Sequence, residues 1–240
     1  MSTRPTSPTP GNGLRRPGAP GFADRLAAAT AEDQQRLLAI PFVEAALAGA
    51  LSRDTYLAFL TEAYHHVKHT VPLLMATGAA LPDRLDWLRD AVVEYIAEEQ
   101  GHDRWILEDI AACGGDADAV RRSAPALPTE LMVAYAWDTV GRVDPLGFFG
   151  MVHVLEGTSV RGASRAAAAL ERSLGLPRQA FTYLTTHGDL DQDHTRFFAA
   201  LMDRLDEADD QARVLHAARV FYRLYGDIFR ALGAHERSAA

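Results

Sequence analysis

Two histidines and an aspartate near the end of the chain have the spacing of a metal site. His187, Asp191 and His194 lie in the stretch HGDLDQDH, four and then three residues apart. In an α-helix these spacings place all three side chains on one stripe of the surface. Imidazole and carboxylate groups are ligands that iron, manganese and zinc accept. The stretch therefore indicates either a transition-metal site or a hydrogen-bonded surface cluster, depending on what faces it.

Acids and histidines also occur in other segments that we expect to be helical. Glu99 and His102 lie three residues apart in EEQGH. Glu156 lies in the apolar run FFGMVHVLEGTSV, where an isolated carboxylate would be costly to bury. Glu156 is therefore interpreted as a ligand or an ion-pair partner, and His153, one turn earlier, as a core or second-layer histidine.

These segments together match the ligand pattern of dinuclear iron or manganese bundles. In such bundles two helices each supply one glutamate, and two others each supply an acid-x-x-His pair. Carboxylates can bridge two metal ions, while neutral imidazoles bind at the outer positions. The pattern, with one extra histidine before the second pair, predicts these ligands: Glu62, Glu99, His102, Glu156, His187, Asp191 and His194.

In the segment that contains Glu62, EAYHHVKH, the three histidines cannot all face the same way. On a helix, His65 and His69 share one stripe, whereas Glu62 and His66 share another. Tyr64 lies between them and is a candidate for substrate binding. Arg161, five residues after Glu156, is a candidate for holding a substrate carboxylate.

Helical periodicity extends through most of the chain after residue 21, and no stretch alternates with period two for long. Long helices joined by short loops predict an all-α antiparallel bundle. Pro72 predicts a kink, residues 117–128 a loop, and residues 185–188 a local loosening. The predicted helices are 22–29, 33–50, 53–77, 82–113, 129–143, 146–174, 178–206 and 209–232.

Composition restricts the class of protein further. The chain has 240 residues, 48% of them hydrophobic, a net charge of −8 and the single cysteine Cys113. The negative charge argues against nucleic-acid binding, and the lack of a long apolar run argues against a membrane span. One cysteine excludes an internal disulfide and a Cys-rich metal site, which fits the cytoplasm. Residues 1–20, rich in proline and without an acid, predict a disordered lead-in to one domain at 21–235.

Two sets of motifs resemble known proteins. The segment PFVEAALAGALSRDTYLAFLTEAYHH resembles the opening of the heme-oxygenase-like fold shared by TenA thiaminases and the pyrroloquinoline quinone synthase. The combination of EEQGH, VLEG and HGDLDQDH resembles the heme-oxygenase-like diiron oxidases and oxygenases, a family of iron-containing redox enzymes. The similarity covers about residues 35–230.

This resemblance implies an all-α, heme-oxygenase-like bundle of about seven helices with two non-heme irons in its core. It implies an oxidoreductase that uses O₂ as co-substrate on a small amino-acid-like or fatty-acid-like substrate, by N-oxygenation, desaturation or oxidative C–C cleavage. An electron donor and a homodimer are further expectations, and an Fe/Mn pair would suit the same ligands. The first-helix ligand is usually glutamate, which Glu62 fits by type, whereas His66 or His69 fits by position.

Two other functions fit the same fold. A TenA-like hydrolase acting on thiamin fragments would need a cysteine nucleophile in its pocket, and the only thiol is Cys113, beside a Gly-Gly turn. A non-catalytic helical bundle or regulator would carry vestigial ligands and bind no iron. The sequence does not identify the substrate, because pocket side chains are scattered over several helices.

Overall fold

Eleven α-helices and three shorter helical segments build the structure, a computed structural model that describes residues 20–239. The structure does not describe the side chains of Arg161, of residues 187–194 or of residues 235–239. The described residues contain no strand, which confirms the all-α prediction. The α-helices are α1 Phe22–Leu38, α2 Pro41–Ala48, α3 Arg53–Val67, α4 Thr70–Ala80, α5 Asp86–Glu99, α6 His102–Ala112, α7 Ala117–Arg122, α8 Leu127–Asp138, α9 Gly147–Leu174, α10 Thr182–Met202 and α11 Ala208–Ala239. The shorter segments are η1 Asp83–Leu85, η2 Thr139–Val143 and η3 Arg178–Phe181.

The expected number of about seven helices is wrong, because predicted long helices are divided. The predicted helix 82–113 is interrupted at Gln100 and Gly101, where Gly101 has a φ of 101° that favours glycine. The predicted helix 53–77 breaks at Lys68 and His69 rather than kinking at Pro72. Pro72 lies in the first turn of α4, where its missing N–H group leaves no helical hydrogen bond unmade.

Several helix ends follow local signals that the sequence displays. Ser52 caps α3, its hydroxyl accepting a hydrogen bond from the Thr55 N–H at 3.1 Å. Gly114 and Gly175 adopt left-handed φ values of 77° and 62° after α6 and α9. Two predictions are wrong: the short helix α7 lies within the predicted loop 117–128, and α10 continues through residues 185–188 without loosening.

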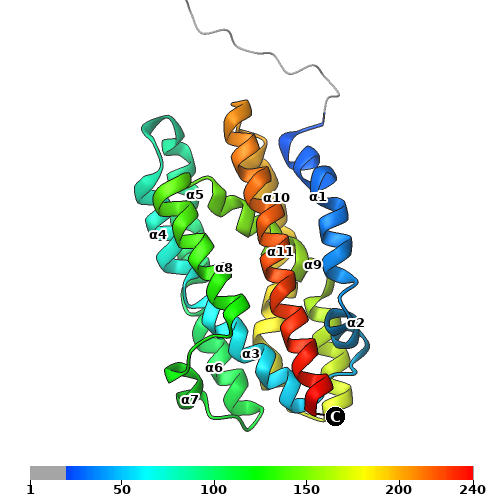
Figure 1. Cartoon of the computed structure of the whole chain (residues 1–240). Helices are drawn as coiled ribbons and strands as arrows, with labels where there is room; N and C mark the ends of the chain where they lie inside the picture. The colour runs from blue at the N-terminus through cyan, green and yellow to red at the C-terminus, as the bar shows by residue number, and fades with distance from the viewer. Residues whose placement is uncertain (1–19, 240) are drawn as a thin grey trace, which may run out of the picture.

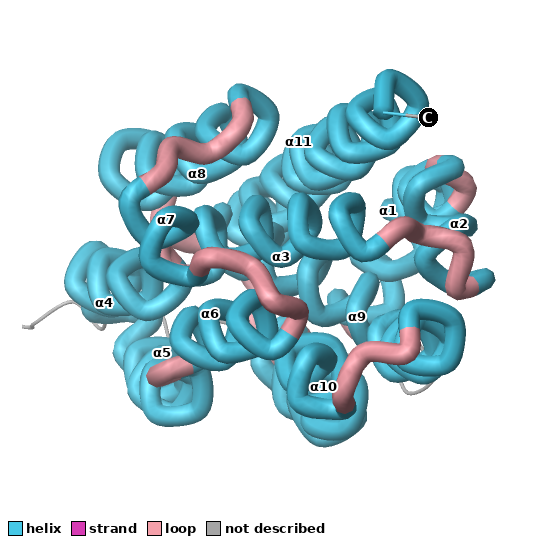
Figure 2. Tube along the Cα trace, turned by 90° about the horizontal axis from the view of Figure 1, so that it is seen from below, coloured by secondary structure: helices cyan, strands magenta, loops and turns pink. Residues whose placement is uncertain are grey.

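The helices form an elongated bundle with α9 in its interior. Figure 1 shows most helices running along the long axis, with α1 on one side and α4, α5 and α8 on the other. In the end-on view of Figure 2, α3 and α9 lie near the middle of the molecule. Helix α9 packs along α10 and α11 and also touches α1, α2 and α4. Residues of α9 can therefore meet side chains from most of the bundle.

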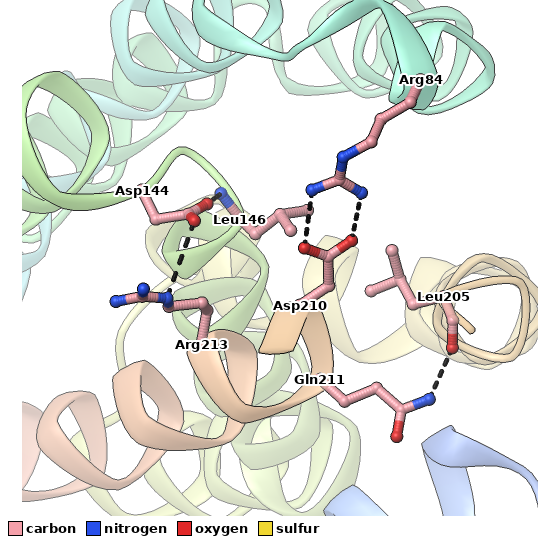
Figure 3. Close-up of polar contacts among 7 residues, drawn as sticks. All are labelled: Arg84, Asp144, Leu146, Leu205, Asp210, Gln211 and Arg213. Atoms are coloured by element: carbon pink, nitrogen blue, oxygen red, sulfur yellow. Dashed lines mark hydrogen bonds and ion pairs between the residues drawn. The ribbon is translucent and has the colours of Figure 1, made fainter. Parts of the chain in front are cut away.

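A polar cluster ties three segments together at one end of the bundle (Figure 3). The Arg84 guanidinium, from η1, donates two hydrogen bonds to the Asp210 carboxylate at the start of α11, at 2.5 and 2.8 Å. Asp210 is only 4% exposed. Asp144 accepts a hydrogen bond from the Leu146 N–H and lies 3.8 Å from Arg213. The cluster fixes the starts of α5, α9 and α11 relative to one another.

Among residues 20–239, no helix has both the length and the apolar character that a bilayer span requires.

Candidate functional site

A mainly apolar cavity of about 160 Å³ lies inside the bundle. Its wall comes from helices α1 to α5 and α9 to α11, so residues far apart in sequence meet there. Phe148 and Met151 of α9 line the cavity, whereas their neighbour Phe149 is packed in the core with no exposed surface. The amphipathic face of α2 is a wall that the sequence analysis did not assign: it contributes Phe42 and Leu47.

Two predicted ligands from distant helices line this cavity together. Glu99, the last residue of α5, and Glu156 of α9 are both part of its wall, and His66 of α3 lines the same cavity. The ring of His66 meets Tyr225 edge-on, with the ring centroids 5.9 Å apart. Carboxylates are seldom placed in an apolar cavity unless they are paired, hydrogen-bonded or bound to a metal. The part of the wall that carries the two acids is therefore the candidate functional site of the cavity.

Tyr95 of α5 lies close to these acids. Its hydroxyl is buried and makes no hydrogen bond with any residue that the structure describes. Burial, reinforced by the carboxylates of Glu156, Glu98 and Glu99, raises the pKa of Tyr95 far above its usual range. Tyr95 therefore remains a neutral phenol that offers a donor hydrogen to this part of the cavity.

His102 lies next to Glu99 across the break between α5 and α6. It is the first residue of α6 and only 2% exposed, and its Nδ1 lies 3.0 Å from Oε2 of Glu99. The ring stacks on Trp105, with centroids 4.3 Å apart. The predicted Glu99-x-x-His102 pair therefore exists, but Gly101 and a change of helix bring it together instead of a continuous helical turn.

The structure separates Glu62 from this group. Its carboxylate accepts hydrogen bonds from the Ala126 N–H, at 3.2 Å, and from the Thr129 hydroxyl, at the start of α8. These contacts hold the Glu62 carboxylate at the start of α8, although the sequence analysis predicted it as a metal ligand. Glu62 lines a different hollow, next to α8 and α11, whereas His66, one turn later on α3, lines the cavity.

The other candidates of the EAYHHVKH segment also point elsewhere. His69 accepts a hydrogen bond from the Trp137 indole at 3.3 Å, and burial lowers its pKa. Tyr64, proposed as a substrate contact, packs edge-on against the His65 ring and beneath the Lys68 ammonium, outside the cavity wall. The alternatives that the sequence left open for the first helix thus differ in position, and His66 alone lines the cavity.

His153 is a partly buried residue that packs between helices. Its Nε2 lies 2.9 Å from the Thr30 hydroxyl of α1, and its ring stacks on Phe198 of α10 at 6.0 Å. Burial lowers its pKa to about 4, so the ring is neutral at physiological pH. His153 joins α1, α9 and α10 and does not line the cavity.

The predicted ligands of HGDLDQDH and the candidate Arg161 lie outside the residues whose side chains are described. The backbone of α10 nevertheless passes the cavity: Leu184, before the stretch, lines it, and Phe197, after the stretch, packs on Tyr95 with ring centroids 5.5 Å apart. Among the side chains that are described, no three of His, Cys, Asp and Glu come together closely enough to hold a metal.

A buried acid that the sequence analysis missed fixes the start of α10. Asp109 of α6 has no exposed surface, and its carboxylate accepts hydrogen bonds from the Thr182 and Tyr183 N–H groups at 3.1 and 2.8 Å. Burial raises the pKa of Asp109 to about 6, against the opposing effect of these hydrogen bonds. No local signal marks this residue, because its partners lie more than seventy positions away.

Cys113 does not have the surroundings of a nucleophile. It follows the last residue of α6, is 2% exposed and does not line the cavity. Burial raises the pKa of its thiol to about 11, so the reactive thiolate is scarce at neutral pH. Cys113 is instead a buried residue at the end of a helix.

The described donors suit a non-heme iron site by their chemical type, although no three of them lie close enough together to hold a metal without further ligands. Glu99, Glu156, His66 and His102 supply carboxylate and imidazole groups, and the buried Tyr95 hydroxyl beside them makes no hydrogen bond within the described residues. Such oxygen and nitrogen donors suit iron and manganese. A metal site built on these donors would need further ligands. The sequence predicts those ligands on α10, the helix that passes the same cavity.

Comparison with known proteins identifies the family. Residues 57–226 match the family model described as iron-containing redox enzyme, which covers more than half of the chain. The chain therefore belongs to the iron-containing redox enzyme family. Among curated protein sequences, none matches it significantly.

Solved structures confirm the heme-oxygenase-like fold. A domain of unknown function from Shewanella denitrificans, described as having that fold, aligns with a TM-score of 0.79 and 22% identity over 89% of this chain and 93% of its own. A TenA homologue from Pseudomonas syringae aligns with a TM-score of 0.75 and 13% identity over 97% and 99%. Heme oxygenase-1 from Synechocystis, solved with heme, gives 0.73 and 12% over 92% and 96%. At these identities the likeness concerns the fold alone.

Proposed function

We propose that this chain is an O₂-dependent non-heme diiron oxidase or oxygenase that acts on a small substrate with an apolar chain. The observation that carries the proposal is the presence of Glu99 and Glu156, from two distant helices, in one largely apolar cavity with His66. Membership of an iron-containing family supports iron as the metal. The first set of ligands would be His66, Glu99, His102 and Glu156, completed by His187, Asp191 and His194 of α10.

The protein would contribute placement and shielding to the reaction. An iron pair, when bound in its reduced state, supplies the activation of O₂. The carboxylates of Glu99 and Glu156 would hold the metals, and the His102 imidazole, whose Nδ1 lies 3.0 Å from Oε2 of Glu99, would lie next to one of them. Tyr95 offers a neutral donor hydrogen, and the aromatic wall excludes water from the site.

The mainly apolar wall of the cavity favours a substrate with a long alkyl chain, such as a fatty acid, over a compact amino acid. Most of the wall residues that the structure describes are aliphatic or aromatic. The hydroxyls of Thr158 and Ser159 in the wall donate to the Val154 and Leu155 carbonyls of their own helix, at 2.6 and 3.1 Å. An alkyl chain buried there gains about 0.8 kcal/mol per methylene.

Metal analysis and O₂ consumption test the proposal together. We expect the anaerobically purified full chain, reconstituted with Fe(II), to retain about two irons. Dodecanoate should accelerate its O₂ consumption, and Glu156→Gln should reduce both iron content and O₂ consumption. A parent chain that retains no iron, or O₂ consumption that is the same for parent and variant, would refute the diiron assignment.

A further inference from the structure

We propose that one arm of the cavity measures the length of the substrate chain. This distal arm is the part of the wall formed by Leu47 of α2 and by Gly162, Ala163, Ala166 and Leu170 of α9. The inference rests on the proposed apolar substrate, but it concerns residues that lie away from the acids. It assigns the selection of chain length to small side chains on one face of α9.

The arm follows α9 away from Glu156. The wall residues contributed by α9 continue from Glu156 to Leu170, and the last of them is only 1% exposed. At 1.5 Å per residue, Ala163 lies about 10 Å, Ala166 about 15 Å and Leu170 about 21 Å along the helix from Glu156. The row of wall residues on α9 is therefore as long as an extended alkyl chain whose polar end would lie near the acids.

Small side chains keep this arm open. Ala163 and Ala166 are 8% and 7% exposed and form its α9 side, so each additional carbon at these positions would enter the arm. Gly162 lies close to α2, since a Cβ atom added there would be 3.2 Å from Cδ2 of Leu47. The two helices therefore approach closely, and the arm cannot widen to accept a longer residue without a shift of the packing.

The positions of the wall residues along α9 correspond to lengths of a substrate alkyl chain. An extended polypeptide has three backbone bonds per residue and spans about 3.3–3.6 Å per residue. Each bond of an extended chain therefore advances about 1.2 Å. A chain with its polar end level with Glu156 reaches Ala163 after about nine carbons, Ala166 after about twelve and Leu170 after about seventeen. A leucine at Ala163 should therefore exclude shorter chains than a leucine at Ala166.

The experiment measures binding of octanoate, dodecanoate and hexadecanoate to the full chain by calorimetry, with and without Fe(II). Each methylene lost from the cavity corresponds to about fourfold in affinity, so displacing two or three lowers affinity roughly 15- to 60-fold. We expect Ala163→Leu to weaken dodecanoate by this factor, to weaken hexadecanoate by at least this factor and to spare octanoate. Ala166→Leu should weaken hexadecanoate by this factor, change dodecanoate little and spare octanoate.

Ala168→Leu is the matched control, because Ala168 is on the exposed face of the same helix. It should bind all three acids as the parent does, and thermal melting shows whether each variant is folded. If a leucine unfolds the chain, Leu170→Ala replaces it and should strengthen binding of chains longer than hexadecanoate.

Folded variants that bind all three acids like the parent, or that lose all three equally, would overturn the inference. Its failure is distinguishable from failure of the proposed function: absence of iron refutes the diiron assignment, whereas the length series can be measured on the metal-free chain.

Discussion

Asp109 makes a sharp prediction because its buried carboxylate has two opposing effects on stability. The carboxylate accepts the N–H groups of Thr182 and Tyr183 and thereby caps the helix that carries three predicted ligands. Its burial also raises its pKa from 3.8 to about 6, so its charge is unfavourable in the folded state. Substitution by asparagine removes the charge and keeps an acceptor, whereas alanine removes both.

The pH dependence follows from the two pKa values. Since the folded state binds its proton more tightly than the unfolded state, the stabilisation is complete below about pH 3.8 and is lost as the pH rises through about 6. A difference of about two pKa units corresponds to roughly 3 kcal/mol. The free energy of unfolding of the parent minus that of Asp109→Asn should therefore fall by about 2–3 kcal/mol between about pH 4 and pH 7.

Urea unfolding at several pH values measures this difference, which cancels the titration of groups common to both chains. At neutral pH, Asp109→Asn should be within about 1 kcal/mol of the parent, or more stable. Asp109→Ala should lose about 2–4 kcal/mol, because two N–H groups lose their acceptor. A difference that does not vary with pH, or an Asn variant as unstable as the Ala variant, would refute the reasoning.

Three further predictions concern single side chains. Tyr95→Phe should leave thermal stability unchanged or raise it by about 1 kcal/mol, since it removes a buried hydroxyl without a hydrogen bond in the described structure; a clear loss by calorimetry would contradict this. Arg84→Ala should lower the free energy of unfolding by about 1–2 kcal/mol, because it leaves the buried Asp210 carboxylate without its guanidinium partner. The loss is limited because Arg84 itself is half exposed. An unchanged urea midpoint would contradict a stabilising role for this ion pair. His153, whose folded pKa of about 4 lies below the unfolded 6.5, should make the parent lose stability as the pH falls from about 6.5 to 4. His153→Gln should lose less over that range in the same urea assay, and equal losses would disprove the assignment.

The sequence predicted the elements and residues whose causes are local. The predicted helix bounds at 53 and 113 lie next to Ser52 and Gly114, and the structure has a hydroxyl cap at the first and a left-handed glycine at the second. Glu156 stood out because an acid within an apolar run needs a reason, and it lines the cavity with Glu99. The all-α bundle followed from the helical period that most of the chain shares.

Contacts between distant residues account for what the sequence could not predict. Glu62 and His66 share a helical stripe, but the N–H group of Ala126, 64 residues away, holds the carboxylate of Glu62 at the start of α8. Helix α5 packs mainly on α4, and α6 mainly on α3, so the break at Gly101 depends on contacts with other helices that one glycine does not reveal. Asp109 was overlooked for the same reason, since its role depends on Thr182 and Tyr183.

The iron content of two matched variants tests the proposed centre most directly. Glu62→Gln and His66→Gln change neighbouring turns of α3 to the same residue, but only His66 lines the cavity. After anaerobic reconstitution with Fe(II), we expect about two irons in the parent and in Glu62→Gln, and about one or fewer in His66→Gln. A parent without iron would contradict the diiron centre, and loss of iron from Glu62→Gln but not from His66→Gln would contradict the ligand set built on this cavity.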